Sequence, residues 1–159
     1  MKQWMTLLVA LALSAAGSVA LSADAKDAAK DREAIQGSWR LVSRELPGGR
    51  SESGEGDGAR RIVFNGDKVQ ILRGEDVRIE GTFKNDPSTS PRTIDIAITK
   101  TSEEGPEAGK TSLGIYELKG DEMRWCAAEP GHADRPKEFS PEGGPFMLVS
   151  MKREAKQGK

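Results

Sequence analysis

The chain has 159 residues, the size of a single domain, with 36% hydrophobic and 31% charged residues, 18 glycines and 8 prolines. Lys and Arg number 24 and Asp and Glu number 25, so the formal net charge is −1. This balance offers no basic face large enough to neutralise a run of phosphates, and we expect no nucleic acid partner. The composition predicts a soluble, turn-rich domain with a modest core and excludes a disordered chain.

Residues 1–23 predict a secretory signal peptide. Lys2 gives a positive start, the segment Met5–Leu13 is almost continuously apolar, and small residues suit cleavage after either Ala20 or Ala23. The alternative is a membrane anchor, because no charge occurs between Lys2 and Ala23. The strongly apolar part is short for a hydrocarbon core of about 30 Å. We therefore expect a secreted or periplasmic protein with no membrane span after cleavage.

Residues 24–36 are Ala-rich and charged and predict a short helix or linker that packs Ile35 against one end of the domain. A helix of about 12 residues is marginal by itself in water. From Gly37 onward the apolar period changes to two, which predicts strands. We expect one β domain over residues 37–154 and a polar tail over residues 155–159.

Alternating apolar and polar residues are clearest in 77–84 and 93–99, typical of half-buried antiparallel strands. Six further β-like segments are expected at 37–43, 60–65, 68–73, 111–119, 122–128 and 146–153. Gly66 and Gly120 predict tight hairpin turns, and no helical pattern long enough for a parallel crossover occurs between the strands. The fold class is therefore all-β: an antiparallel, up-and-down barrel of about eight strands, preceded by a short N-terminal helix, because closure removes exposed edges.

Three long polar loops, Leu46–Ala59, Thr101–Gly109 and Glu129–Gly144, interrupt this meander. In an up-and-down order they open at the same end, which we expect to be the mouth of the barrel. The first loop is Gly-rich and is predicted to be flexible.

Gly37-Ser38-Trp39 opens the first expected strand, and Arg153 lies near the end of the last. If these two strands pair, the guanidinium of Arg153 can lie over the indole of Trp39, a cation–π contact. The alternative is two unrelated residues, a core Trp and a solvated Arg. We expect the pair, with Gly37, to close the barrel.

This arrangement resembles the lipocalin (calycin) pattern, in which a Gly-x-Trp opens the first strand and a late Arg packs on the Trp. Nearly the whole mature chain is similar to a planctomycete family of small secreted lipocalin-like domains. The segments that carry this similarity are 31–39, 81–83 with 86–88, 94–95, 114–118 with 120–121, Cys126 with 130–131, 135–136 and 139, and 152–154. The resemblance implies the barrel and export; that family has no established biochemical activity. The cross-paired cysteines of lipocalins are absent.

The apolar face of the expected barrel is formed by Val77, Ile79, Phe83, Ile94, Ile96, Ile98, Met123 and Trp125. These side chains either line a lumen that binds a small apolar molecule or interdigitate and fill it, since eight strands lie near the size where both occur. We expect dense filling near Trp39 and a shallow pocket at the mouth.

Residues suited to catalysis are few. His132 is the single histidine and Cys126 the single cysteine, so a His/Cys zinc site lacks ligands, and no strained nucleophile turn is present. Cys126 is either a small packing residue or a reactive thiol. We expect no enzyme, no cofactor and no metal. The predicted function is binding of a small hydrophobic or amphipathic ligand at the mouth; the alternative is a packed module that binds another envelope protein through its long loops.

Overall fold

The computed structural model describes residues 18–56, 59–102 and 105–155. It contains one helix, α1 (Ser18–Ile35), and nine strands within these ranges. The strands are β1 (Gly37–Leu46), β2 (Arg50–Ser53), β3 (Arg60–Asn65), β4 (Lys68–Arg73), β5 (Asp76–Asp86), β6 (Arg92–Thr101), β7 (Thr111–Lys119), β8 (Glu122–Ala128) and β9 (Phe146–Arg153).

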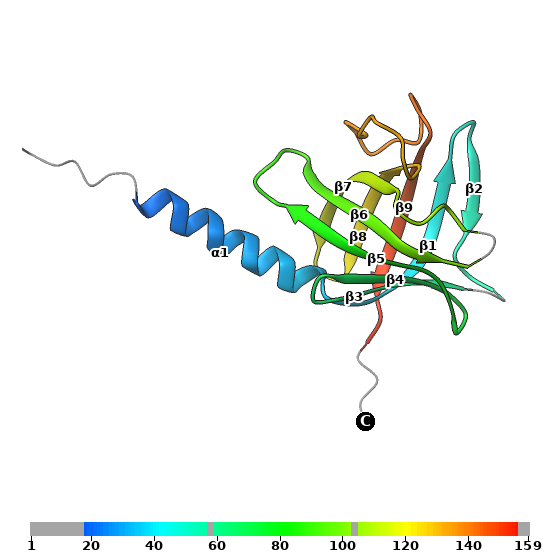
Figure 1. The fold of residues 1–159 in the computed structure, drawn as a ribbon, viewed down its shortest axis with the longest axis horizontal. Coiled ribbons are helices and arrows are strands. Elements are labelled where there is room, and N and C mark those ends of the chain that lie inside the picture. The colour runs from blue at the N-terminus through cyan, green and yellow to red at the C-terminus, as the bar shows by residue number, and fades with distance from the viewer. Residues whose placement is uncertain (1–17, 57–58, 103–104, 156–159) are drawn as a thin grey trace, which may run out of the picture.

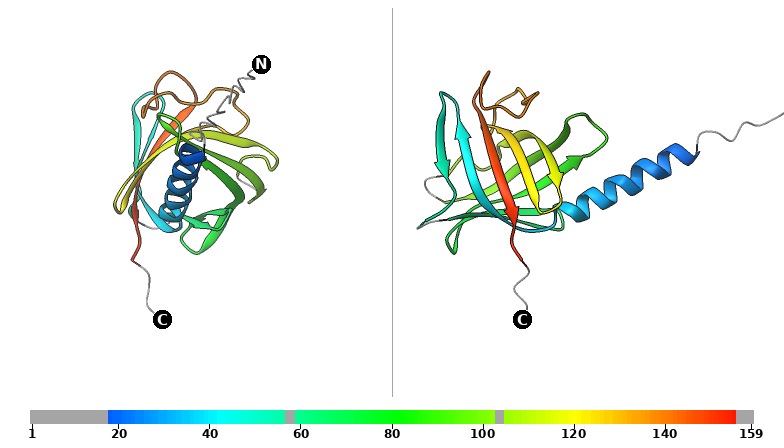
Figure 2. Two further views of the ribbon diagram at one scale, coloured as in Figure 1. Left: turned by 90° about the vertical axis from the view of Figure 1, so that its left-hand side faces the viewer. Right: turned by 180° about the vertical axis from the view of Figure 1, so that it is seen from behind.

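Every pairing between neighbouring strands is antiparallel, and the order is β2-β1-β3-β4-β5-β6-β7-β8-β9. An additional pairing of β1 with β9 closes the sheet, with Trp39 opposite Arg153. The two strands lie side by side in Figures 1 and 2. The predicted antiparallel up-and-down barrel of eight strands is therefore confirmed, with β2 as one extra strand.

The extra strand β2 lies within the loop that the sequence predicts to be flexible. β2 pairs with the second half of β1, Ser43 opposite Ser53, whereas β3 pairs with the first half, Gly37 opposite Phe64. The second half of β1 therefore does not pair with β3 and forms a hairpin with β2 instead. Part of the Gly-rich loop is a strand because β1 is long enough to pair twice.

The predicted hairpins at Gly66 and Gly120 are present, and both glycines have positive φ, 65° and 60°. Helix α1 begins at Ser18, upstream of both predicted cleavage points, and so is longer than the helix expected over residues 24–36. Residues 1–17 of the predicted signal peptide and 156–159 of the predicted tail lie outside the described residues. No helix in the described part of the chain is both long and apolar enough to cross a membrane.

Helix α1 projects away from the barrel and meets it with its C-terminal end (Figures 1 and 2). Ile35 is fully buried, and its carbonyl accepts a hydrogen bond of 2.7 Å from the indole Nε1 of Trp39. Arg32 stacks over the ring of Phe83, 5.0 Å from the centroid. The helix end therefore covers the end of the barrel that carries Trp39, opposite the mouth.

A polar network joins the same helix to the barrel. The hydroxyl of Tyr116 donates to the carboxylate of Asp31, which also accepts from Asn85 at 3.3 Å and pairs with Arg92 at 2.6 Å. Burial, followed by the hydrogen bond to Asp31, raises the pKa of Tyr116 well above its ordinary value. The network gives hydrogen-bond partners to both the buried phenol of Tyr116 and the buried carboxylate of Asp31. Buried polar groups in native proteins are generally paired in this way.

Candidate functional site

The barrel interior is open at the end away from α1. Two adjoining cavities of about 290 and 620 Å³ lie there. They share the lining residues Arg44, Ile71, Ile79, Pro106, Trp125 and Met147. Pro47, Pro130 and Pro145 line the larger cavity; with Pro106, they place all three long loops at this mouth. Cavities of this size are typical of sites for small molecules.

The interior is densely filled in its lower half. Phe83, Ile94 and Met123 are at most 2% exposed and belong to the same buried cluster as Trp39. The rings of Phe64 and Phe83 meet edge to face, with centroids 4.9 Å apart. These predicted lumen residues lie in packed core and are not among the residues that line the two cavities.

The cavities begin above this core. Ile79 and Trp125 line both of them, and Ile96 and Ile98 line the larger one. Four of the eight predicted lumen residues therefore lie at the mouth. Gly114 leaves room for the indole of Trp125, because a Cβ there would lie 2.5 Å from its Nε1.

Val77 is the exception to the expected apolar face, and its placement there is wrong. It is 40% exposed and lines neither cavity. The register of β4 against β5 shifts between Ile79 and Val77, so strict alternation fails at this point. Arg78, the residue between them, lines the smaller cavity instead. Such a bulge redirects side chains locally.

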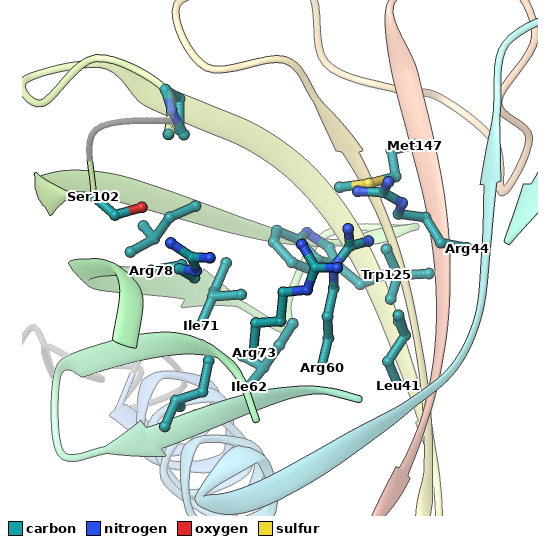
Figure 3. Close-up of a pocket in the computed structure, with 15 residues that line it drawn as sticks. Leu41, Arg44, Arg60, Ile62, Ile71, Arg73, Arg78, Ser102, Trp125 and Met147 are labelled. Atoms are coloured by element: carbon teal, nitrogen blue, oxygen red, sulfur yellow. The ribbon is translucent and has the colours of Figure 1, made fainter. Parts of the chain in front are cut away.

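Four arginines line the smaller cavity: Arg44, Arg60, Arg73 and Arg78. They are all the charged side chains in its lining among the described residues. Figure 3 shows them around the indole of Trp125, from β1, β3, β4 and β5. Sequence reasoning missed this group because it followed only apolar residues.

A signal for two of the arginines was present in the sequence. Arg60 is in phase with the buried Ile62 on β3, and Arg73 is in phase with Ile71 on β4. Arg44 is different: Trp39 and Leu41 face inward, and alternation from them places Arg44 outside. A register shift between Leu41 and Ser43 reverses the alternation and puts Arg44 in the cavity.

Arg60 and Arg73 are directly opposite each other in the β3–β4 ladder. Like charges directly opposite each other destabilise a sheet. The carboxylate of Glu52 on β2 offsets part of the positive charge of the four arginines. One of its oxygens lies 2.5 Å from a terminal nitrogen of Arg44 and 3.4 Å from one of Arg60. Arg50 also contacts Glu52, at 3.1 Å, so three guanidinium groups share it.

The pKa values of these groups reflect the crowding. Burial would raise the pKa of Glu52, but the hydrogen bond from Arg44 and the charges of Arg44, Arg60 and Arg50 lower it overall. Burial, followed by the charge of Arg44, lowers the pKa of Arg60. The lining of the smaller cavity therefore holds more positive charge than Glu52 balances.

Two buried polar atoms at the mouth have no hydrogen-bond partner among the described residues. They are Nε of Arg44 and Nε1 of Trp125. Trp125 is 4% exposed. Buried donors are paired in the great majority of native structures, so these two atoms are exceptions; both are closed to a water-sized probe, and Nε1 of Trp125 lies against Gly114, which lines neither cavity.

The predicted closure residues lie at the opposite end of the barrel. The guanidinium carbon of Arg153 is 4.2 Å from the centroid of the Trp39 ring. Gly37 has a φ of 108°, and a Cβ there would be 3.4 Å from a terminal nitrogen of Arg153. Glycine thus permits both the backbone turn and the approach of the guanidinium.

The loop of residues 129–145 also covers part of the outer face of the sheet. Phe139 and Phe146 pack on a second buried cluster of Ile115, Cys126 and Leu148. Arg135 fixes the loop with two contacts to the carboxylate of Asp95, at 2.5 and 3.0 Å. Cys126 is fully buried there, and burial raises the pKa of its thiol. The described residues contain no group of three or more His, Cys, Asp or Glu arranged to hold a metal ion.

In comparisons with known proteins, no family model matches the chain, and no curated protein matches it. The geometry of the barrel mouth is therefore the basis for a functional conclusion.

Proposed function

We propose that the chain is an exported, non-catalytic binding protein that holds a small hydrophobic or amphipathic molecule at the mouth of its barrel. The observation that carries this proposal is the pair of adjoining cavities, 290 and 620 Å³, above a fully packed lower core. We also propose membership of the family of small secreted lipocalin-like domains that the sequence resembles.

The shape of the interior supports binding over complete filling. Aromatic and branched side chains of the lower half, such as Phe83 and Ile94, line neither cavity, whereas the small residues Ala127 and Ser112 line the larger cavity in the upper half. Small residues on the inner face of a barrel leave volume that larger ones would fill. Ile71, Ile79 and Trp125 supply the apolar surface that a ligand would cover.

The test is binding of a neutral apolar dye, Nile red, to the protein produced from the full chain. We expect saturable fluorescence enhancement. The variant Ile71→Thr with Ile79→Thr should bind the dye about tenfold more weakly, because each change removes apolar surface worth roughly 0.8 kcal/mol per methylene. The intact mass of the same preparation also reports whether cleavage occurs after Ala20 or Ala23.

The matched control is Val63→Thr with Val77→Thr, which alters two β-branched residues on the same sheet that line neither cavity. We expect it to bind the dye as the unaltered protein does. Absence of saturable binding of the dye and of any aliphatic amphiphile would overturn the proposal. Equal loss in the control variant would show that the dye binds elsewhere. Co-purification of a protein partner instead of a small molecule would favour the interaction module.

A further inference from the structure

The charge at the barrel mouth is unevenly distributed between the two cavities. Among the described residues, the charged ones that line the smaller cavity are Arg44, Arg60, Arg73 and Arg78. The larger one is lined by Arg44, Glu107, Lys110 and Glu129, two positive and two negative side chains. The described lining therefore has a cationic part and an electrically balanced, mainly apolar part.

We propose that the four arginines form a subsite for a single anionic group, a carboxylate or a phosphate monoester, on an amphipathic ligand whose apolar part lies against Ile71, Ile79 and Trp125. This inference rests on the proposed function and names the chemical class of the ligand. Planar guanidinium groups match the oxygens of both anions and bind them with two parallel hydrogen bonds.

The first support is the arrangement of the sheet, which brings these charges together at a cost. Arg60 and Arg73 oppose each other across β3 and β4. The irregularities of β1 and β5 each place one more arginine, Arg44 and Arg78, in the same lining. An incoming anion would relieve the repulsion within this group. Four strands contribute one arginine each, so the subsite is built by the tertiary fold.

The second support is the shortage of carboxylates beside the group. Glu52 is the described carboxylate that contacts it, and Glu52 is shared by Arg44, Arg60 and Arg50, at 2.5, 3.4 and 3.1 Å. The four guanidinium groups therefore retain positive charge and terminal nitrogens that an anionic ligand would use.

The experiment compares four C12 amphiphiles by calorimetry: dodecanoate, dodecyl phosphate, dodecanol and dodecylammonium. Each charged compound is used below its critical micelle concentration, and dodecanol is used below its solubility limit. We expect at least one anion to bind about tenfold or more tightly than dodecanol, since one charge-assisted interaction is worth roughly that factor. Dodecylammonium should bind most weakly. The stronger of the two anions identifies the headgroup, and inorganic phosphate alone tests whether the headgroup suffices.

The decisive variant is Arg60→Gln with Arg73→Gln, which keeps a polar, hydrogen-bonding side chain at both positions and removes the opposed charges. We expect anion affinity to fall about tenfold or more, and to fall at least several-fold more than the affinities for dodecanol and Nile red, since those ligands carry no charge for the arginines to bind. The control is Arg61→Gln: Arg61 is the neighbour of Arg60 on the opposite face of β3, where it contacts Glu75 at 3.3 Å. It removes one arginine outside the cavity and should leave every affinity unchanged.

A gain of affinity provides an independent readout. Glu52→Gln removes the carboxylate that competes for Arg44 and Arg60, so anions should bind several-fold more tightly and dodecanol equally well. Equal affinity for dodecanol and both anions, with Nile red binding intact, would overturn the anionic subsite and leave the proposed function standing. Failure of all four amphiphiles and of Nile red would overturn both.

Discussion

Arg153 lies over the ring of Trp39, with its guanidinium carbon 4.2 Å from the ring centroid, although 114 positions separate the two residues. The same guanidinium donates to the carbonyls of Gln36 and Ala34, at 2.7 and 2.6 Å. These carbonyls are at the C-terminal end of α1, where a positive charge is favourable. One side chain thus joins the last strand, the first strand and the helix.

We expect Arg153→Gln to lower the free energy of unfolding by about 2–3 kcal/mol, because it removes the cation–π contact and two charge-assisted hydrogen bonds. Urea denaturation measures this loss. Lys152→Gln is the control, because Lys152 is exposed and its contact to Glu122 is 3.5 Å long on the surface; it should change stability by less than about 0.5 kcal/mol.

A double-mutant cycle with Trp39→Phe isolates the stacking itself. Its coupling energy should be about 0.5–2 kcal/mol. Strictly additive effects of the two substitutions would contradict an energetic role for the stacked geometry.

The phenol of Tyr116 should titrate above its usual range near pH 10. The chain contains one tyrosine, so the alkaline rise of tyrosinate absorbance reports this group alone. Asp31→Asn should move the transition back towards its ordinary pH, because it removes the carboxylate that favours the protonated phenol. A native transition at the ordinary pH would contradict the buried network.

The sign of the linked stability follows from the direction of this shift. The folded state keeps the phenol proton at a pH where an unfolded tyrosine has lost it. The contribution of Tyr116 to the free energy of unfolding is therefore complete below about pH 10 and is lost as the pH rises through the folded-state pKa. The variant Tyr116→Phe has no phenol to titrate, so its free energy of unfolding should fall less steeply as the pH rises above about 10.

Cys126 should be unreactive in the native protein. Its side chain is fully buried, its Sγ lies 3.3 Å from the carbonyl of Ser140, and burial raises its pKa, so little reactive thiolate forms. An aromatic disulfide reagent should label it slowly under native conditions and stoichiometrically in urea. Phe139→Ala opens the covering loop and should accelerate labelling. Rapid labelling of the unaltered native protein would show the thiol to be accessible.

Much of the fold could be predicted from the sequence because the determining signals are local. Period-two alternation in 93–99, the turn glycines Gly66 and Gly120, and the absence of a crossover helix were sufficient for an antiparallel meander. The second strand, β2, could not be predicted, because the segment that contains it is Gly-rich and charged. It forms a strand because the second half of β1, which does not pair with β3, lies beside it.

The candidate site was predictable only in part. Ile79 and Trp125 follow the alternation and line the mouth, whereas Val77 does not, because a one-residue register shift turns it outward. The same kind of shift brings Arg44 inward. The shifts depend on which strand pairs with which, and no local pattern carries that information.

The sequence by itself determined a meander with one apolar face and a Trp and an Arg at its two ends. Each of these follows from side-chain alternation and turn chemistry within a few residues. Only the tertiary structure decided that four arginines from β1, β3, β4 and β5 line one cavity above a packed core. Strand register and bulges fix which side of the sheet each guanidinium faces, and both are set by contacts between segments far apart in the chain.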